Sequence, residues 1–209
     1  MRRPEFIARQ ASRPRGMIGR LLGHVMAIET ASLNSEALGL LALQASDHLL
    51  EVGFGHGRTI RLAAAQVPQG FVAGVDVSRD MVRMAQRRCL DLTGKGLVEL
   101  MVGDSRRLPY ADISFDKVLC VHTIYFWEEP IKHLGEIFRV LKPGGRLVLG
   151  FRAKSDKGST TDFPETVYSF YSIDEVSTLL ESAGFEKSSI RNAGTPPGEM
   201  YLAVARRPY

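Results

Sequence analysis

The 209-residue chain has only two cysteines and no apolar run approaching the length of a membrane span. Cys89 and Cys120 each lie within an apolar pattern, so we expect two small buried side chains rather than a disulfide. A reducing cytoplasm suits such a chain. The histidines show no metal-ligand spacing and no cysteine accompanies them, so no metal site is expected. These shortages argue against a disulfide-stapled secreted domain, a membrane-spanning protein and a zinc-type centre.

The net charge of +4 is unevenly distributed along the chain. Residues 1–28 hold six arginines against one glutamate, a net +5, so the remainder carries −1. Hydrophobic residues make up 44% and charged residues 24%, which is ordinary for one globular domain of this length. A basic arm on a near-neutral body suits an anionic lipid surface, a nucleic acid or an acidic substrate. A solvated tail is the alternative interpretation.

Strand and helix patterns alternate from about residue 45 onward, which predicts a mostly parallel sheet with helices on both faces. We expect residues 1–44 to form a basic arm and cap helices, and residues 45–209 to form one domain. Within the arm, residues 1–16 are expected to have little regular structure. The helix pattern at 131–141 is expected to stop at Lys142-Pro143-Gly144-Gly145. Residues 152–172 are polar, then aromatic, and are a candidate lid over the substrate. Two closing strands are expected at 186–191 and 200–205.

Glycines at every second position follow the first apolar strand: Gly53, Gly55 and Gly57. Glu51 stands two residues before them, and a helical pattern follows at once. The order strand, glycine turn, helix places free backbone N–H groups beside a ligand. A dinucleotide fingerprint has its third glycine three residues after the second, and here that residue is Arg58. The spacing therefore argues against a nicotinamide-dependent oxidoreductase.

Asp76 ends the second predicted strand, residues 71–76, and lies 23 positions after Gly53. An acidic side chain at this distance from a glycine loop accepts hydrogen bonds from both hydroxyls of a ribose. Val77 and Met81 follow it and are candidates for apolar contact with an adenine ring. Together with the glycine loop, Asp76 predicts a nucleoside site at the carboxyl ends of the strands.

The third predicted strand covers residues 98–104, and Gly103, Asp104 and Ser105 lie at its end. Asp104 is a candidate acceptor for the amino hydrogens of adenine, and Ser105 for a second polar contact. The alternative for Asp104 is to cap the next turn.

The fourth predicted strand covers residues 117–121 and leads into His122. Tyr125 and Trp127 follow shortly after. The pKa of a histidine suits it to remove a proton from a substrate, so His122 and Tyr125 are the candidate catalytic residues. The alternative for His122 is a backbone contact with the cofactor. Tyr125 and Trp127 suit either an aromatic pocket, which would also steady a cationic acceptor, or the hydrophobic core.

Over roughly residues 45–151 the sequence resembles the class I S-adenosylmethionine-dependent methyltransferases. The matching segments are Glu51-Val52-Gly53-Phe54-Gly55-His56-Gly57, Gly74-Val75-Asp76-Val77-Ser78, Gly103-Asp104 and Val140-Leu141-Lys142-Pro143-Gly144-Gly145. Within this superfamily it looks most like small-molecule enzymes similar to those of quinone biosynthesis and to bacterial phospholipid N-methyltransferases. The Asn-Pro-Pro-Tyr motif of nucleic-acid methyltransferases is absent, because His122-Thr123-Ile124-Tyr125 stands in its place. A nucleic-acid acceptor is therefore not expected.

The resemblance implies a Rossmann-like, doubly wound, seven-stranded sheet, mostly parallel with an antiparallel last strand. It also implies direct S_N2 transfer of a methyl group from S-adenosylmethionine to a small-molecule or lipid acceptor, with S-adenosylhomocysteine as product. The expected cofactor-binding residues are Glu51, Gly53, Gly55, Gly57, Asp76, Val77, Met81, Gly103, Asp104, Ser105 and His122. Two alternatives stand beside this prediction. One is an enzyme that works at the inner membrane surface through residues 1–28, and the other is a non-catalytic protein that only binds the cofactor.

Overall fold

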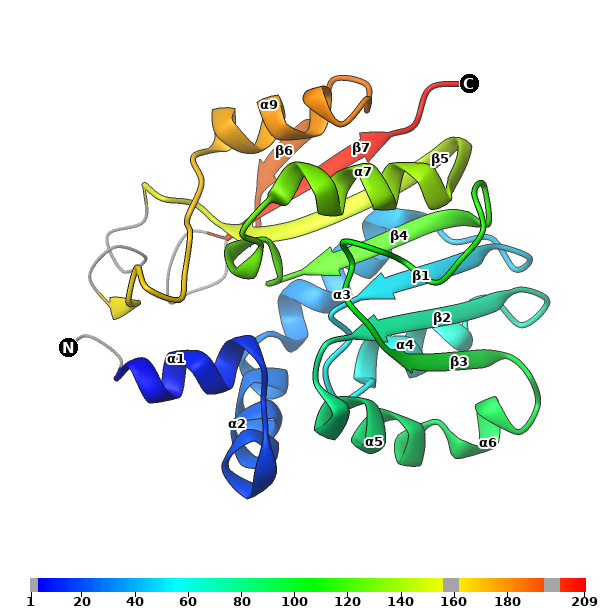
Figure 1. The fold of residues 1–209 in the computed structure, drawn as a ribbon. Coiled ribbons are helices and arrows are strands. Elements are labelled where there is room, and N and C mark those ends of the chain that lie inside the picture. Colours follow the sequence, from blue (N-terminus) through cyan, green and yellow to red (C-terminus); the bar gives the residue numbers. More distant parts are fainter. Residues whose placement is uncertain (1–3, 156–161, 194–199) are drawn as a thin grey trace.

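The computed structural model describes residues 4–155, 162–193 and 200–209, and they contain one seven-stranded sheet (Figure 1). The strand order is β3-β2-β1-β4-β5-β7-β6. The strands are β1 (His48–Val52), β2 (Phe71–Asp76), β3 (Val98–Val102), β4 (Phe115–Val121), β5 (Leu141–Arg152), β6 (Ser189–Asn192) and β7 (Met200–Arg206). Strands β1 to β5 pair in parallel, whereas β7 is antiparallel to both β5 and β6. The predicted sheet with an antiparallel last strand is confirmed.

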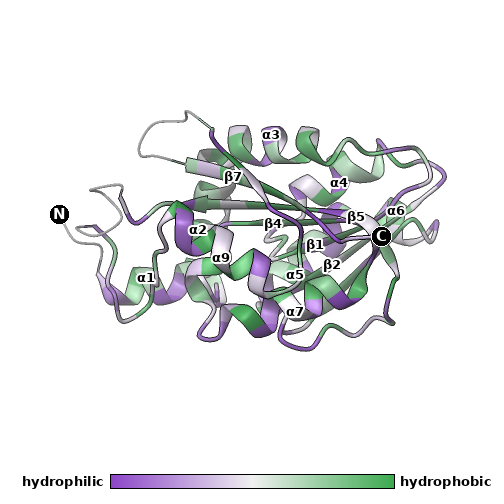
Figure 2. Ribbon diagram, turned by 90° about the horizontal axis from the view of Figure 1, so that it is seen from above, coloured by the Kyte–Doolittle hydropathy of each residue, from purple (hydrophilic) through white to green (hydrophobic). Residues whose placement is uncertain are grey.

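Helices cover both faces of the sheet, with α3 and α4 on one side and α7 and α9 on the other (Figure 2). The helices are α1 (Glu5–Ser12), α2 (Gly16–Glu29), α3 (Ala31–Leu41), α4 (Arg58–Ala64), α5 (Arg79–Arg88), α6 (Leu90–Thr93), α7 (Pro130–Val140) and α9 (Ile173–Ser182), and a 3-10 turn spans Ile124–Phe126. Helices α1 and α2 lie beside the carboxyl ends of the strands (Figure 1). Among the described residues, no helix has the length and hydrophobicity needed to cross a bilayer.

The central strands are apolar at successive positions because both faces of the sheet are covered. In β1, Leu49 is buried in the cluster under α3, α4 and α5, and Leu50 is buried in the cluster under α7 and α9. Each fully buried leucine stabilises the fold by about 1.5–3 kcal/mol relative to an exposed one. Cys89 and Cys120 are both buried free thiols, as their apolar context predicts.

Local signals in the sequence set the helix starts. The Ser78 side chain accepts a hydrogen bond from the Met81 N–H and caps α5. Pro130 occupies the first turn of α7, where its missing N–H costs nothing. Ser172 and Glu175 form a capping box at the start of α9. These caps orient the helices that frame the carboxyl edge of the sheet.

The structure corrects one expectation and refines another. The arm is not irregular up to residue 16, since Glu5–Ser12 forms α1, supported by a Glu5–Arg9 ion pair and by burial of Ala8. The expected stop of the helix before Lys142 is confirmed, since α7 ends at Val140, but the segment Lys142-Pro143-Gly144-Gly145 already belongs to β5, because Leu141 pairs with Phe115. A shift of register between Phe115 and Lys117 absorbs the extra residues.

Part of the candidate lid, residues 156–161, lies outside the described residues. Of the described remainder, Tyr168 and Phe170 stack with parallel rings 5.6 Å apart and pack against Tyr125. This portion of the segment therefore belongs to the hydrophobic core.

Candidate functional site

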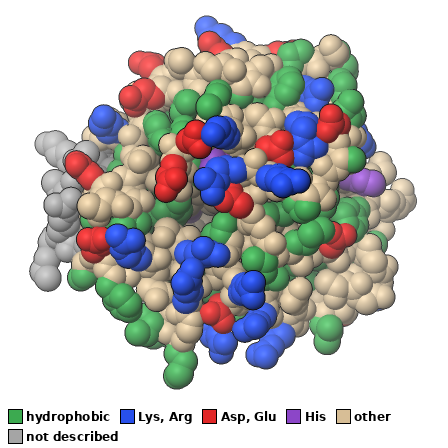
Figure 3. Space-filling view, in the orientation of Figure 1, with side chains coloured by type: hydrophobic (Ala, Val, Ile, Leu, Met, Phe, Trp, Pro, Cys, Tyr) green, Lys and Arg blue, Asp and Glu red, His purple; other side chains and the backbone are tan. Residues whose placement is uncertain are grey.

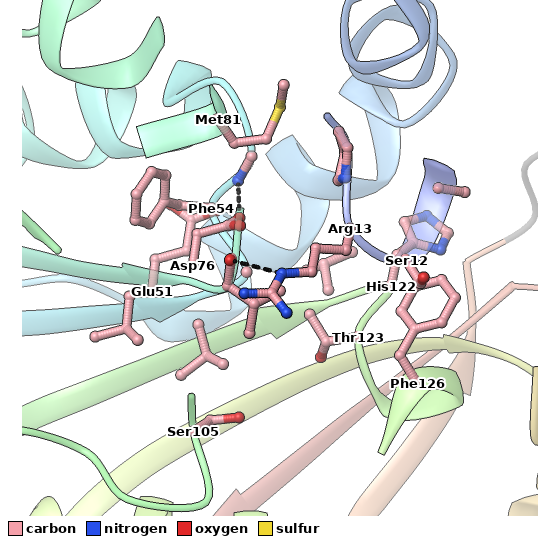
Figure 4. Close-up of a pocket in the computed structure, with 18 of the residues that line it drawn as sticks. Ser12, Arg13, Glu51, Phe54, Asp76, Met81, Ser105, His122, Thr123 and Phe126 are labelled. Atoms are coloured by element: carbon pink, nitrogen blue, oxygen red, sulfur yellow. Dashed lines mark hydrogen bonds between the residues drawn. The ribbon is translucent and has the colours of Figure 1, made fainter. Parts of the chain in front are cut away.

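A cavity of about 600 Å³ lies beyond the carboxyl ends of β1, β2 and β4. The strand order reverses direction between β1 and β4, and parallel sheets bind ligands at such a switch point. Figure 4 shows Glu51, Phe54 and Asp76 on one side of the cavity and Ser12, His122 and Phe126 on the other, with Arg13 reaching between them. Ten of the eleven predicted cofactor-binding residues line this cavity.

The exception is Gly57, which has a packing role. Its φ is +81°, and a Cβ there would lie 2.6 Å from the Cβ of Ala85 on α5. Gly55 has a φ of +56°, and a Cβ there would meet no atom within 4 Å. The backbone of Gly55 therefore borders open space in which a ligand can approach it closely.

Asp76 connects the ends of β1 and β2. Its carboxylate accepts hydrogen bonds from the N–H of Gly55 at 2.9 Å and from the N–H of Ser78 at 2.8 Å. Burial nevertheless raises the pKa of Asp76 to about 6. A carboxylate has about four acceptor positions, so two bonds leave capacity for a ligand. The residue expected to hold a ribose thus also orders the glycine loop.

Glu51 is buried in the cavity wall, and its Oε2 atom has no hydrogen-bond partner among the described residues. Burial, with the nearby negative charge of Asp76, raises the pKa of Glu51 well above its ordinary value. An unpaired buried carboxyl oxygen is costly unless a ligand satisfies it. A cationic ligand such as S-adenosylmethionine, with its ammonium and sulfonium groups, fits this position.

Asp104 caps the turn after β3, which is the second of the two roles considered for it. It accepts hydrogen bonds from the N–H of Arg106 at 2.9 Å and from the Arg106 guanidinium at 2.8 Å. Asp104 also lines the cavity, so its contact with adenine stays a prediction.

Ser105 belongs to a cluster that sequence reasoning missed. Its Oγ lies 2.7 Å from Nδ1 of His133, and the His133 ring stacks on Trp127 with centroids 4.6 Å apart. Burial lowers the pKa of His133 to about 4, so the ring is neutral at pH 7. Trp127 is buried and also lines the cavity, so a role in binding an acceptor stays a prediction.

His122 lies on the cavity wall, but Tyr125 lies behind it in the core. His122 has a φ of +59°, an uncommon conformation for a residue with a side chain and one that is often found at functional sites. Its Nδ1 lies 3.2 Å from the Tyr125 hydroxyl oxygen, and that oxygen accepts the Arg152 N–H at 2.5 Å. Burial, with the positive charge of Arg152, lowers the pKa of His122 to about 4. The ring is thus a weak base.

The N-terminal segment forms a wall of the cavity, which the sequence did not indicate. Pro14 O accepts the Ser78 hydroxyl at 2.5 Å, and the N–H of Gly16 donates to Asp80 at 2.8 Å. From this position Arg13 Nε donates to the Val77 carbonyl at 3.2 Å. No local pattern reveals such pairs, because Pro14 and Ser78 are 64 positions apart.

The chain is similar to known methyltransferases in both sequence and structure. Residues 50–149 match a family described as a methyltransferase domain. The chain is 30% identical over 188 residues to the uncharacterized methyltransferase YdaC of Bacillus subtilis, covering 90% of this chain and 98% of that one. It is 31% identical to the 27-O-demethylrifamycin SV methyltransferase of Amycolatopsis mediterranei, covering 85% and 68%. A crystal structure of a SAM-dependent methyltransferase from Aquifex aeolicus superposes with a TM-score of 0.71 at 26% identity, covering 85% and 92%.

Proposed function

This chain belongs to the class I S-adenosylmethionine-dependent methyltransferases, and from this premise we propose that it methylates a small-molecule acceptor in the cavity beside His122. The observation that carries the proposal is the unpartnered, buried Oε2 of Glu51 in the same cavity as Asp76 and the open backbone of Gly55. The relative named for 27-O-demethylrifamycin SV supports an acceptor of this class.

Each wall of the cavity has a separate task in this proposal. S-adenosylmethionine supplies a methyl group on a positively charged sulfur, which is a good leaving group. Asp76 would hold the ribose hydroxyls, Glu51 the cationic end, and Val77 and Met81 the adenine. The chain itself contributes orientation, proximity and exclusion of water.

Titration calorimetry of the full chain with S-adenosylmethionine and S-adenosylhomocysteine tests this function. Binding of both, together with S-adenosylhomocysteine formation from an acceptor panel, is the expected result. A folded protein that binds neither ligand would overturn the proposal. Binding without turnover on a broad panel would instead favour the non-catalytic alternative.

The affinity for S-adenosylhomocysteine is expected to fall as the pH is lowered from 8 to 5. With a pKa of about 6, Asp76 is charged above pH 6 and becomes protonated below it, so it progressively loses its capacity to accept ribose hydroxyls. Affinity then falls roughly tenfold per unit below pH 6. Calorimetry between pH 8 and pH 5 measures how the affinity for S-adenosylhomocysteine changes with pH. Asp76→Asn, which has no carboxyl group to titrate at this position, should bind more weakly and with a shallower pH dependence, because Glu51 in the same cavity still titrates. A flat wild-type profile would contradict the prediction.

We propose further that residues 1–28 associate with an anionic membrane surface. Helix α2 has large apolar side chains that the described residues leave exposed: Met17 (85% exposed), Ile18 (53%), Leu21 (67%), Val25 (44%) and Ile28 (76%). Lys and Arg side chains gather around α2 and α5 on the face shown in Figure 3, and Arg79, Arg83 and Arg87 lie at a spacing of four along α5. An apolar helix face beside clustered arginines suits an anionic bilayer.

Leu21→Glu is expected to reduce co-sedimentation of the full chain with phosphatidylglycerol vesicles at least tenfold, because it places a negative charge on the apolar face. The matched control is Leu90→Glu, which changes an equally exposed leucine (72%) on α6. Neutral phosphatidylcholine vesicles should bind neither variant nor the wild type. Equal sedimentation of the two variants would contradict a role for α2.

A further inference from the structure

The Tyr125 hydroxyl is buried and its hydrogen bonds can be assigned. Tyr125 is 5% exposed, and its oxygen accepts the backbone N–H of Arg152, since an N–H can only donate. The hydroxyl hydrogen still needs an acceptor, and a buried hydroxyl without one costs about 1–3 kcal/mol. Among the described residues, the acceptor within reach is Nδ1 of His122 at 3.2 Å. Tyr125 therefore donates to His122.

This donation determines which nitrogen of His122 carries the hydrogen. Burial, with the positive charge of Arg152, holds the pKa of His122 at about 4, so the ring is neutral at pH 7 and has one N–H group. Because Nδ1 accepts from Tyr125, the hydrogen is on Nε2. His122 thus offers a donor where a general base would need a free lone pair.

We propose that Tyr125 is a positioning residue that holds His122 as the Nε2–H tautomer, and that this N–H binds a negatively charged oxygen of the methyl acceptor, as in a phenolate or carboxylate. The acceptor class rests on the proposed function, whereas the tautomer does not. The general-base role considered for His122 is replaced by this donor role.

The surroundings of His122 favour the same acceptor. Arg13 and Ser12 from the N-terminal segment line the cavity with His122 (Figure 4). The Ser12 hydroxyl donates to the Arg9 carbonyl, whereas Arg13 uses only its Nε–H on the Val77 carbonyl and offers its terminal N–H groups as donors. The Arg152 guanidinium adds positive charge close to the His122 ring. These donors and charges stabilise an oxygen anion and lower the pKa of an acceptor hydroxyl. An anionic oxygen would bond to the methyl carbon through its own lone pair while the methyl–sulfur bond breaks and S-adenosylhomocysteine leaves with that electron pair, so no proton has to be removed at this site.

Nitrogen-15 NMR of the full chain tests the tautomer directly. The His122 ring nitrogens, assigned by their loss in His122→Gln, are measured between pH 6 and 8 with bound S-adenosylhomocysteine. An unprotonated Nδ1 and a protonated Nε2 are expected, and the reverse pattern would overturn the inference. Calorimetry on the same sample separates the two proposals, because failure to bind S-adenosylhomocysteine would overturn the proposed function alone.

Tyr125→Phe tests the positioning role and should give a mixture of both tautomers. The matched control is Tyr110→Phe, since Tyr110 is another largely buried tyrosine whose hydroxyl has no partner among the described residues. The control should leave the His122 signals unchanged. If Tyr125→Phe retains only the Nε2–H form of His122, then Tyr125 does not set the tautomer. If this variant does not fold, the wild-type spectrum alone decides the tautomer.

The acceptor class is tested by titrating the S-adenosylhomocysteine complex at pH 8 with 4-nitrophenolate and with uncharged 4-nitroaniline. At least tenfold tighter binding of the phenolate is expected. Equal binding of the two compounds, or binding of neither, would overturn the anionic acceptor.

Discussion

Asp76→Ala is expected to weaken S-adenosylhomocysteine binding by at least about 100-fold, because two hydrogen bonds from ribose to a charged group, at about 1.5–3 kcal/mol each, are lost together. The substitution also removes the acceptor for the N–H groups of Gly55 and Ser78, so the glycine loop loses its connection to β2. Both effects act on the same ligand. Titration calorimetry at pH 8, where Asp76 is ionised, measures the change.

The matched control for Asp76→Ala is Asp112→Asn. Asp112 is an exposed aspartate whose ion pair with Arg139 lies outside the cavity, so its substitution should leave the affinity at the wild-type value. Asp76→Asn retains one acceptor oxygen and should fall between the wild type and Asp76→Ala. If Asp76→Ala binds S-adenosylhomocysteine as tightly as the wild type does, Asp76 is not the ribose ligand.

Gly55→Val is expected to abolish detectable cofactor binding. The φ of +56° at this position is strained for a β-branched residue, at a cost of roughly 1–2 kcal/mol or more. Since no atom lies within 4 Å of the Cβ position, the added methyl groups would enter the cavity and take space needed by the ligand. Calorimetry should show at least a 100-fold loss of affinity, and thermal unfolding should show a Tm several degrees lower.

The matched control for Gly55→Val is Gly135→Ala. Gly135 lies within α7, and a Cβ there also meets no atom within 4 Å, but its φ is ordinary. This variant should be more stable by up to about 1 kcal/mol, because alanine favours a helix over glycine, with unchanged affinity. A Gly55→Val protein that binds like the wild type would show that the ligand does not approach the glycine loop.

The sequence predicted those parts of the fold that are encoded by residues close together in the chain. The apolar strand, the glycines and the following helix occur within one short stretch ending in α4, and the structure places them as expected. Ser78 is another local signal, since a cap bonds to a residue three positions later. Tertiary contacts override weak local propensity at two places that the sequence did not predict. Burial of Ala8 supports α1, and pairing of Leu141 with Phe115 extends β5 through a Pro-Gly-Gly segment that usually forms a turn.

Sequence alone determined the fold class and, through the resemblance to a known family, the cofactor. Strand and turn periodicity also identified the residues at the strand ends, because parallel strands bring those residues to one edge of the sheet. Only the tertiary structure decided the protonation states and the hydrogen-bond partners of these residues. The orphaned oxygen of Glu51 and the neutral His122 depend on burial, which no spacing reveals. The cavity wall at Arg13 depends on a contact between segments 64 positions apart. The tautomer of His122 depends on where one buried hydroxyl finds its acceptor. These are properties of packing, and they appear only when distant parts of the chain come together.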